Sequence, residues 1–139
     1  MRLRPEAARY LCIPILACFE DGRYPVVAHS LQETVGDAPA FRKTSFSIAR
    51  EKPFIDALAT TGRRSVVLIG FETDVCIAQS ALELSDLQYR VAVVEDVVHA
   101  PGDGHNQGLE RIVRAGITVL SLRALYYEWM ADVVTERAF

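Results

Sequence analysis

The sequence has little of several features that would assign it to a specialised class of protein. Its 139 residues contain only two lysines against thirteen arginines, and no basic cluster offsets the formal net charge of −3. A surface that binds nucleic acid needs a row of basic side chains, so no nucleic-acid partner is expected. The longest apolar runs, residues 65–71 and 91–94, are strand-sized, whereas a membrane-spanning helix needs about 20 apolar residues. No membrane segment is therefore predicted.

Cysteine is also scarce. The three cysteines, Cys12, Cys18 and Cys76, are an odd number without metal-site spacing, so reduced thiols rather than a disulfide framework are expected. The apolar stretch at residues 11–19 is broken by Pro14 and lacks the small-residue cleavage site of a secretory signal. These features predict a cytoplasmic protein.

Strand-like and helical segments alternate along the chain. Short β-branched runs, apolar on both faces, occur at residues 13–19, 66–69, 90–95 and 117–120. This alternation is typical of an α/β protein whose mainly parallel sheet is covered by helices on both faces. The length suits a single domain over residues 1–139. We therefore expect the four runs to form one parallel sheet.

Helical spacing of apolar residues predicts four helices, at residues 53–61, 76–87, 105–115 and 122–135. A shorter helix that begins with a proline is expected over residues 5–11. Residues 20–39 contain two glycines and two prolines and are expected to be mostly loop. The pattern over residues 41–48 is ambiguous.

The most informative stretch follows the predicted strand at residues 66–69. A polar turn comes after Gly70, and Cys76 then opens a helix. Ligands of open α/β sheets bind beyond the carboxyl ends of the strands, where this turn is expected. Thr73 or Asp74 can cap the helix, and its unpaired N–H groups can stabilise a thiolate or form an oxyanion hole. Without further context, however, such a cysteine is more often a small apolar core residue.

Several segments together resemble one enzyme family. They are GFETDVCI at residues 70–77, Ala81-Leu82, YRVAVVED at residues 89–96, the helix and strand around Gly116, and residues 9–17. They resemble the isochorismatase-like cysteine hydrolases, and the resemblance covers nearly the whole chain. The segment RKTSFS at residues 42–47 is similar to the lysine segment of the nicotinamidase-related branch.

The resemblance implies a Rossmann-like three-layer α/β/α fold and a Cys–Asp–Lys triad. Cys76 would attack the carbonyl carbon of a small amide or related substrate to form a thioester, and Lys43 would hold the thiolate and shuttle charge. Backbone N–H groups of Cys76 and Glu72 would form the oxyanion hole, with a cis peptide bond after Phe71. The expected partner is this small-molecule substrate, and no cofactor is expected.

A metal is not predicted either. The three histidines, His29, His99 and His105, lack the spacing of paired ligands, so the metal site of nicotinamidases is not supported. Because the chain uses arginine for nearly all its cations, Lys43 is less expected as a random surface charge, which favours a functional role. A buried lysine also titrates more readily than an arginine, as a residue that handles protons must. The ordinary interpretation of Lys43 alone is a solvated surface charge.

For three other residues, a structural role explains the sequence at least as well as a functional one. Cys12 and Cys18 flank an apolar strand and are expected to be buried in apolar surroundings. Asp96 ends a predicted strand, where capping of a loop is at least as good an interpretation as a place in the pocket.

The chain departs from the family at its start. The aspartate of the triad lies on a central first strand that precedes the helix expected at residues 5–11, and only residues 1–4 precede that helix here. The resemblance therefore implies an N-terminally truncated version of the fold. A misassigned start, a fragment, or a sheet that has closed up or is completed by a partner chain would each explain this. Glu20, Asp21 or Glu72 could supply a substitute carboxylate, although no motif favours one of them.

The first functional hypothesis is therefore a hydrolase that uses Cys76. The second is a degenerate relative that serves as a binding or oligomeric subunit, and the third is redox sensing by Cys76. A homo-oligomer is expected because a terminal helix is crowded with apolar and aromatic side chains. These side chains are Leu125, Tyr126, Tyr127, Trp129 and Met130.

Overall fold

The computed structural model describes residues 8, 10–20 and 36–138. The chain divides into two compact units that meet in the sequence between Gly62 and Arg63. Each unit is described separately below, and the expectation of a single domain stays a prediction. The expected helix at residues 5–11 and the expected loop at residues 20–39 lie largely outside the described residues.

The N-terminal unit contains two short parallel strands, β1 (Ala17–Glu20) and β2 (Ala40–Lys43). Their register runs from Ala17 opposite Ala40 to Glu20 opposite Lys43. Side chains alternate between the faces of a strand, so Phe41 and Lys43 share one face of β2. Both are less exposed than Ala40 and Arg42, which share the other face. The ambiguous stretch at residues 41–48 thus begins as a strand.

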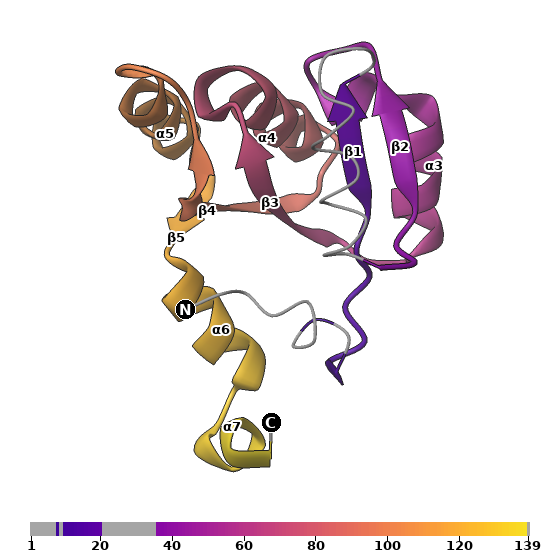
Figure 1. The fold of residues 1–139 in the computed structure, drawn as a ribbon, viewed down its shortest axis with the longest axis vertical. Helices are drawn as coiled ribbons and strands as arrows, with labels where there is room; N and C mark the ends of the chain where they lie inside the picture. Colours follow the sequence, from indigo (N-terminus) through magenta and orange to yellow (C-terminus); the bar gives the residue numbers. More distant parts are fainter. Residues whose placement is uncertain (1–7, 9, 21–35, 139) are drawn as a thin grey trace. The chain divides into compact units, whose positions relative to one another are not determined.

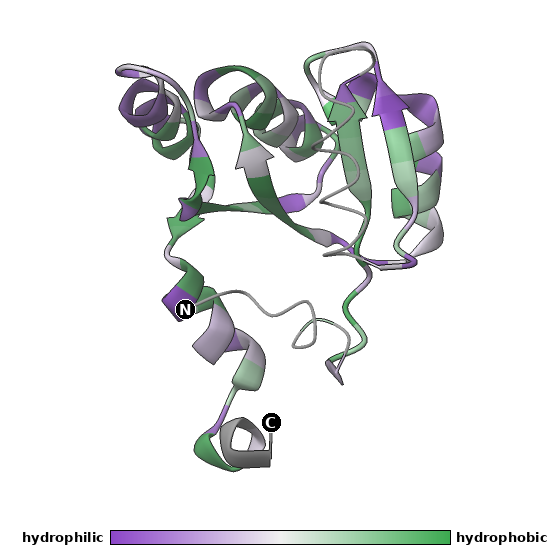
Figure 2. Ribbon diagram, in the orientation of Figure 1, coloured by the Kyte–Doolittle hydropathy of each residue, from purple (hydrophilic) through white to green (hydrophobic). Residues whose placement is uncertain are grey.

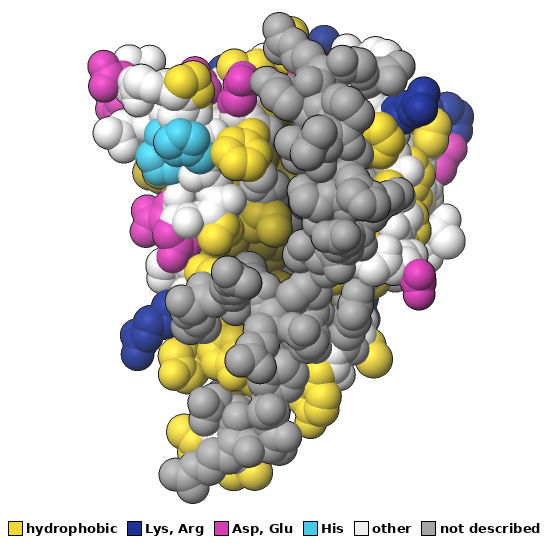
Figure 3. Space-filling model, viewed as in Figure 1, with side chains coloured by type: hydrophobic (Ala, Val, Ile, Leu, Met, Phe, Trp, Pro, Cys, Tyr) yellow, Lys and Arg dark blue, Asp and Glu magenta, His cyan; other side chains and the backbone are white. Residues whose placement is uncertain are grey.

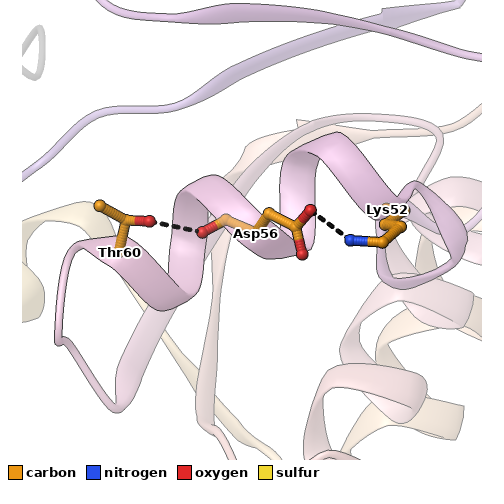
Figure 4. A network of polar contacts seen from close by, with 3 residues as sticks. All are labelled: Lys52, Asp56 and Thr60. Carbon is orange, nitrogen blue, oxygen red and sulfur yellow. Dashed lines mark hydrogen bonds and ion pairs between the residues drawn. The ribbon is translucent and has the colours of Figure 1, made fainter.

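A helix follows β2 and packs on this unit. The short 3-10 helix η1 (Ile48–Arg50) leads into α3 (Lys52–Thr60), which has a proline in its first turn. Phe54 and Leu58 are one helical turn apart and are buried, and the Phe54 ring lies edge-on to Phe41 with centroids 5.6 Å apart. On its exposed face, Lys52 contacts the Asp56 carboxylate, and the Thr60 hydroxyl donates to the Asp56 carbonyl (Figure 4). The helix expected at residues 53–61 is therefore confirmed.

The C-terminal unit contains a three-stranded parallel sheet in the order β3-β4-β5. Its elements are β3 (Ser65–Phe71), the turn η2 (Thr73–Ile77), α4 (Ala78–Asp86), β4 (Arg90–His99), α5 (Gly104–Arg114), β5 (Thr118–Leu120), α6 (Leu122–Met130) and α7 (Val133–Ala138). In Figure 1, α4 and α5 lie together on one side of the sheet and α6 lies on the other. The strands are largely hydrophobic (Figure 2). Parallel strands covered by helices confirm the α/β class.

The core of this unit lies between the sheet and its helices. Leu84 of α4, Ile112 of α5, and Val93 and Val94 of β4 are all completely buried. Helices α4 and α5 contact both each other and neighbouring strands. Burial of both faces explains why residues 91–94 form a continuous apolar run.

The expectation of one sheet containing all four predicted strands is wrong. Three of them, β3, β4 and β5, form one sheet, whereas the fourth, β1, pairs with β2 in a separate two-stranded sheet. Within the described residues, no strand ladder joins the two sheets. β1 pairs instead with β2, whose four residues, two of them basic, give only a weak strand signal, so the sequence did not predict this pairing.

The single closing helix expected over residues 122–135 is also wrong, because it is divided into α6 and α7. Ala131 has a φ of 63°, outside the helical region, and ends α6. The Asp132 carboxylate then accepts hydrogen bonds from the N–H groups of Val134 and Thr135, which starts α7.

Burial of side chains in α6 weakens the argument from the sequence for an oligomer. Leu125 and Met130 are buried within the chain, whereas Tyr127 is exposed and has the Arg123 guanidinium over its ring. Less apolar surface is therefore available for association than the sequence suggests.

None of the helices in the described ranges is both long and apolar enough to span a bilayer.

Candidate active site

The residues of η2, Thr73–Ile77, form the connection between β3 and α4, here called the Cys76 turn. The N–H of Ile77 donates to the carbonyl of Glu72 over 2.9 Å, and the N–H of Ala78 donates to the carbonyl of Thr73. These bonds span five residues and make one wide π-helical turn, a feature often found at functional sites. Cys76 is partly exposed there, beyond the carboxyl end of β3. This is where a ligand of an open α/β sheet is expected.

The strand that leads into the Cys76 turn is irregular at its end. Its register with β4 shifts between Leu68 and Gly70, and Gly70 has a φ of 127°. An L side chain rarely adopts this backbone conformation, so a glycine is needed at position 70. The Phe71–Glu72 peptide bond is cis, as the resemblance implies. A bulge next to a site is a common way to redirect a strand end.

The expectation that Thr73 or Asp74 caps the helix is wrong. Glu72 occupies the capping position of η2 and makes no side-chain capping bond. The Thr73 hydroxyl is completely buried and instead lies 3.0 Å from His105 Nδ1, at the start of α5. A buried hydroxyl needs one hydrogen-bond partner, and here that partner comes from another helix.

Helix α5 also approaches the Cys76 turn through its glycines. A methyl group added to Gly108 would lie 2.7 Å from the backbone nitrogen of Asp74 and from the carbonyl carbon of Thr73. A methyl group added to Gly104 would lie 2.6 Å from the Asp74 carboxylate. The first half of α5 therefore packs directly on the backbone of the turn.

Lys43 is buried, with 7% of its surface exposed, so the interpretation of a solvated surface charge is wrong. It ends β2 and begins the segment at residues 43–47, here called the Lys43 loop. Its Nζ donates to the carbonyl of Ser45 over 3.2 Å, and Glu20 stands opposite it in the strand register. The ammonium group is thus held by a backbone carbonyl just beyond the carboxyl end of β2.

Glu51, at the start of α3, fixes the Lys43 loop. Its Oε1 accepts hydrogen bonds from the N–H groups of Ser45, over 2.7 Å, and Thr44, over 2.8 Å. These bonds, with a smaller contribution from the charge of Lys43, lower the pKa of Glu51 below its ordinary value of 4.5. Glu51 therefore stays ionised and holds the loop as a charged acceptor.

The structure places the expected site residues in two groups. Cys76, the expected nucleophile, lies in the turn after β3 in the C-terminal unit, and Glu72, an expected oxyanion-hole donor, immediately precedes that turn. Lys43 lies in the N-terminal unit. Asp96 accepts a hydrogen bond from the N–H of Leu122 over 2.7 Å and so caps α6, which supports its interpretation as a capping residue.

The expectation that Cys12 is buried is wrong. Cys12 is exposed and has a φ of 53°, because the chain turns there before β1 begins at Ala17. Cys18 lies within β1 and is partly exposed. Neither cysteine is enclosed in an apolar core.

Two of the histidines lie in the C-terminal unit. The rings of His99 and His105 are stacked with centroids 6.3 Å apart, and Phe71 lies edge-on to His99. Figure 3 draws histidine side chains in cyan at the surface of the molecule. His29 lies outside the described residues. In the part of the chain that the structure describes, no three His, Cys, Asp or Glu side chains are grouped as metal ligands would be.

The N-terminal unit has a hollow of about 710 Å³ that is separate from its candidate residue. It is lined by residues 13–16, 36–39 and the end of α3. Residues 13–16 and 36–39 precede β1 and β2, whereas Lys43 stands at the opposite, carboxyl ends of these parallel strands. The hollow is therefore not part of the Lys43 loop.

Comparison with known proteins identifies the family. Residues 16–124 match the Isochorismatase domain. The chain belongs to the isochorismatase family. A relative, the secreted isochorismatase effector Isc1 of Phytophthora sojae, is 31% identical over 135 residues. The alignment covers 91% of this chain and 63% of that protein, so the chain spans less than two-thirds of the relative's length.

Solved structures confirm the isochorismatase fold. The YcaC gene product of Escherichia coli, an octameric hydrolase of unknown specificity, matches with a TM-score of 0.84 at 20% identity, over 96% of this chain and 70% of that one. The nicotinamidase SaPncA of Staphylococcus aureus matches with a TM-score of 0.73 at 20% identity, over 86% of this chain and 78% of that one. The resemblance seen in the sequence is therefore confirmed at the level of family and fold.

Two residues that hold the Lys43 loop and the Cys76 turn, one in each unit, have no signal in the sequence. Glu51 carries no motif, and its contact with the Lys43 loop depends on how η1 reverses the chain. The spacing of His105 in the sequence raises only the question of a metal ligand. Its hydrogen-bond partner Thr73 lies 32 residues earlier in the chain, so no local pattern links the two. Neither contact has a local sequence signal that could have predicted it.

Proposed function

We propose that this chain is a cysteine hydrolase that acts on a small amide or related carbonyl substrate through a thioester on Cys76. The observation that supports this most is the position of Cys76, partly exposed, in the π-helical turn beyond β3. Membership in the isochorismatase family and the fold likeness to a nicotinamidase agree with hydrolysis of an amide. Backbone N–H groups of Cys76 and Glu72 are the proposed donors to the oxyanion.

The proposed reaction has two halves. The sulfur of Cys76 attacks the carbonyl carbon, and the negative charge that develops on the carbonyl oxygen is stabilised by backbone N–H groups. The C–N bond then breaks, and the leaving nitrogen takes the proton that came from the thiol. Water attacks the resulting thioester, releases the carboxylic acid and returns a proton to the sulfur. The net reaction is the addition of one water across the amide bond.

Lys43 is proposed to stabilise the thiolate and to carry charge during these steps. Its burial supports this role, because a buried ammonium group is more sensitive to a nearby negative charge than an exposed one. The Lys43 loop offers a fixed position for the ammonium, since both the Ser45 carbonyl and Glu51 hold this segment.

The full chain tests the proposal through ammonia release from a panel of small primary amides that includes nicotinamide. We expect Cys76→Ser to abolish turnover, and Lys43→Ala to lower it at least about a hundredfold if the ammonium supports the thiolate in the transition state. Cys12→Ser and Cys18→Ser are matched controls that change a thiol elsewhere, and they should keep turnover within about twofold of the starting chain.

The opposite results are equally informative. No turnover of any amide, together with binding of amides that Cys76→Ser does not change, would replace the hydrolase with the degenerate binding subunit. Association of the chain with itself is also proposed, because the YcaC product that shares its fold is octameric. Light scattering at micromolar concentration tests this, and a monomer at all concentrations would contradict it.

A further inference from the structure

The Cys76 turn has a polar anchor at its first residue. Thr73 is completely buried, and its hydroxyl forms a hydrogen bond of 3.0 Å with His105 Nδ1. Leaving a buried hydroxyl without a partner costs more than one hydrogen bond contributes, so this pair is strongly held together. The bond connects the turn to a helix that begins more than thirty residues later.

The same helix limits where the backbone of the turn can move. Gly108 leaves no room for even a methyl group between α5 and the Thr73–Asp74 peptide. The packed glycine sets the separation between helix and turn, and the hydrogen bond of His105 sets the orientation of Thr73. Each contact restricts a different motion of the same two residues.

The ring of His105 is in turn oriented by its neighbours. His99 of β4 stacks on it, and Phe71, the last residue of β3, lies edge-on to His99. Histidine side chains form one cyan patch on the face drawn in Figure 3. Stacking on His99 restricts the plane of the His105 ring, and the hydrogen bond of 3.0 Å places its Nδ1 against the Thr73 hydroxyl.

We infer that His105 is a positioning residue that acts through Thr73 to hold the Cys76 turn in its reactive shape. This inference rests on the proposed function, since it concerns the reactivity of Cys76. Thr73 precedes Cys76 by three residues, and its carbonyl accepts the hydrogen bond from the N–H of Ala78. A rotation at Thr73 therefore displaces the turn whose N–H groups are proposed to face developing negative charge.

Alkylation of Cys76 by iodoacetamide at pH 7, followed by mass spectrometry of the cysteine peptides, tests this without a known substrate. His105→Leu removes the hydrogen-bonding nitrogen, whereas His105→Asn keeps a polar group close to the position of Nδ1. We expect His105→Leu to slow alkylation of Cys76 about fivefold, the equivalent of one typical hydrogen bond. His105→Asn should restore the rate to within about twofold, and Cys12 provides an internal reference in every sample.

The matched pair at the other end of the bond keeps the test decisive if His105→Leu fails to fold. Thr73→Val has nearly the same shape as threonine but lacks the hydroxyl, and Thr73→Ser retains the hydroxyl. We expect Thr73→Val to slow alkylation of Cys76 about fivefold and Thr73→Ser to stay within about twofold of the original rate.

Three outcomes would overturn the inference. One is an unchanged Cys76 rate in folded His105→Leu or Thr73→Val. Another is a faster alkylation rate, because a loosened fold makes the Cys76 thiol more accessible without lowering its reactivity. The third is a failure of Asn or Ser to restore the rate. If instead the original chain shows no amide turnover but the variants behave as expected, the proposed function fails and the positioning role remains.

Discussion

Cys76 and Lys43 both lie at the point where a parallel strand ends, but their surroundings differ in kind. The Cys76 turn is held by close packing on Gly108 and by the buried bond between Thr73 and His105. The Lys43 loop is held by the ionised Glu51, whose carboxylate accepts two backbone N–H groups. One connection is fixed by shape, the other by charge.

This difference has consequences for how each region responds to change. Close packing tolerates almost no added volume, because an inserted methyl group must displace backbone atoms. A carboxylate that accepts backbone hydrogen bonds tolerates changes in volume but loses its effect when it is protonated. The Cys76 turn should therefore respond most to size, and the Lys43 loop to acid.

The largest effect is expected from Gly108→Ala, which places a methyl group against the backbone of Thr73 and Asp74. We expect it to lower the free energy of unfolding by about 3 kcal/mol. Urea unfolding followed by the fluorescence of Trp129, the only tryptophan, measures this in the same unit.

Gly104→Ala is the matched control on the same helix. Its added methyl group meets the Asp74 carboxylate, a side chain that can rotate away, rather than backbone. We expect a change of no more than about 1 kcal/mol, because alanine also favours the helix over glycine. Equal losses for the two variants would show that the backbone contact of Gly108 does not fix the turn.

A smaller effect, confined to the other region, is expected from Glu51→Ala. The N–H groups of Thr44 and Ser45 lose their acceptor, so we expect their hydrogen exchange to become about tenfold faster. Glu51→Gln, which retains an uncharged acceptor, should give an intermediate rate. The amide of Ile77 in the Cys76 turn is the reference, and its exchange should not change.

The two regions also differ in how far the sequence predicts them. The Cys76 turn follows an apolar run and a glycine, so both the strand and the position of Cys76 beyond it could be predicted. The Lys43 loop follows a strand of only four residues, Ala40–Lys43, whose two basic residues weaken the strand signal. Lys43 is buried although the residues on either side of it are exposed, and no local pattern around Lys43 reveals this.

Contacts between distant residues and unusual backbone angles account for most of the remaining errors. The partner of Thr73 was unpredictable because a threonine before a helix usually caps it, and the tertiary contact with His105 prevails here. The break between α6 and α7 depends on Ala131, an alanine with a positive φ. Alanine is the residue that best favours a continuous helix, so its identity pointed the other way.

Acid should act on the Lys43 loop through Glu51. Because the pKa of Glu51 is below its ordinary value of 4.5 in the folded chain, its contribution is present above that value. The contribution is lost as the pH falls through the folded pKa, since the unfolded chain takes up the proton first. We expect the amide resonances of Thr44 and Ser45 to shift in a transition centred below pH 4.5.

Glu51→Gln removes the titrating group and should abolish this transition. The C-terminal unit has a comparable group in Asp132, whose pKa is lowered by the N–H groups of Thr135 and Val134. Acid should therefore also loosen the start of α7 in the C-terminal unit. A transition at Thr44 and Ser45 that persists in Glu51→Gln would contradict the role given to Glu51.

The smallest effects are expected from two exposed ion pairs, one in each unit, which set the baseline for the comparison. Lys52 and Asp56 on α3 have 82% and 61% of their side chains exposed, and Arg114 and Glu110 on α5 have 77% and 60% exposed. Water screens such pairs, so Asp56→Ala and Glu110→Ala should each change the free energy of unfolding by less than about 0.5 kcal/mol. In α3, the bond from Thr60 to the Asp56 carbonyl survives the substitution because it uses the backbone.

A loss of stability for Glu110→Ala as large as that of Gly108→Ala would mean that any change on α5 disturbs the Cys76 turn. The specific contacts of Gly108 and His105 would then no longer explain the shape of that turn.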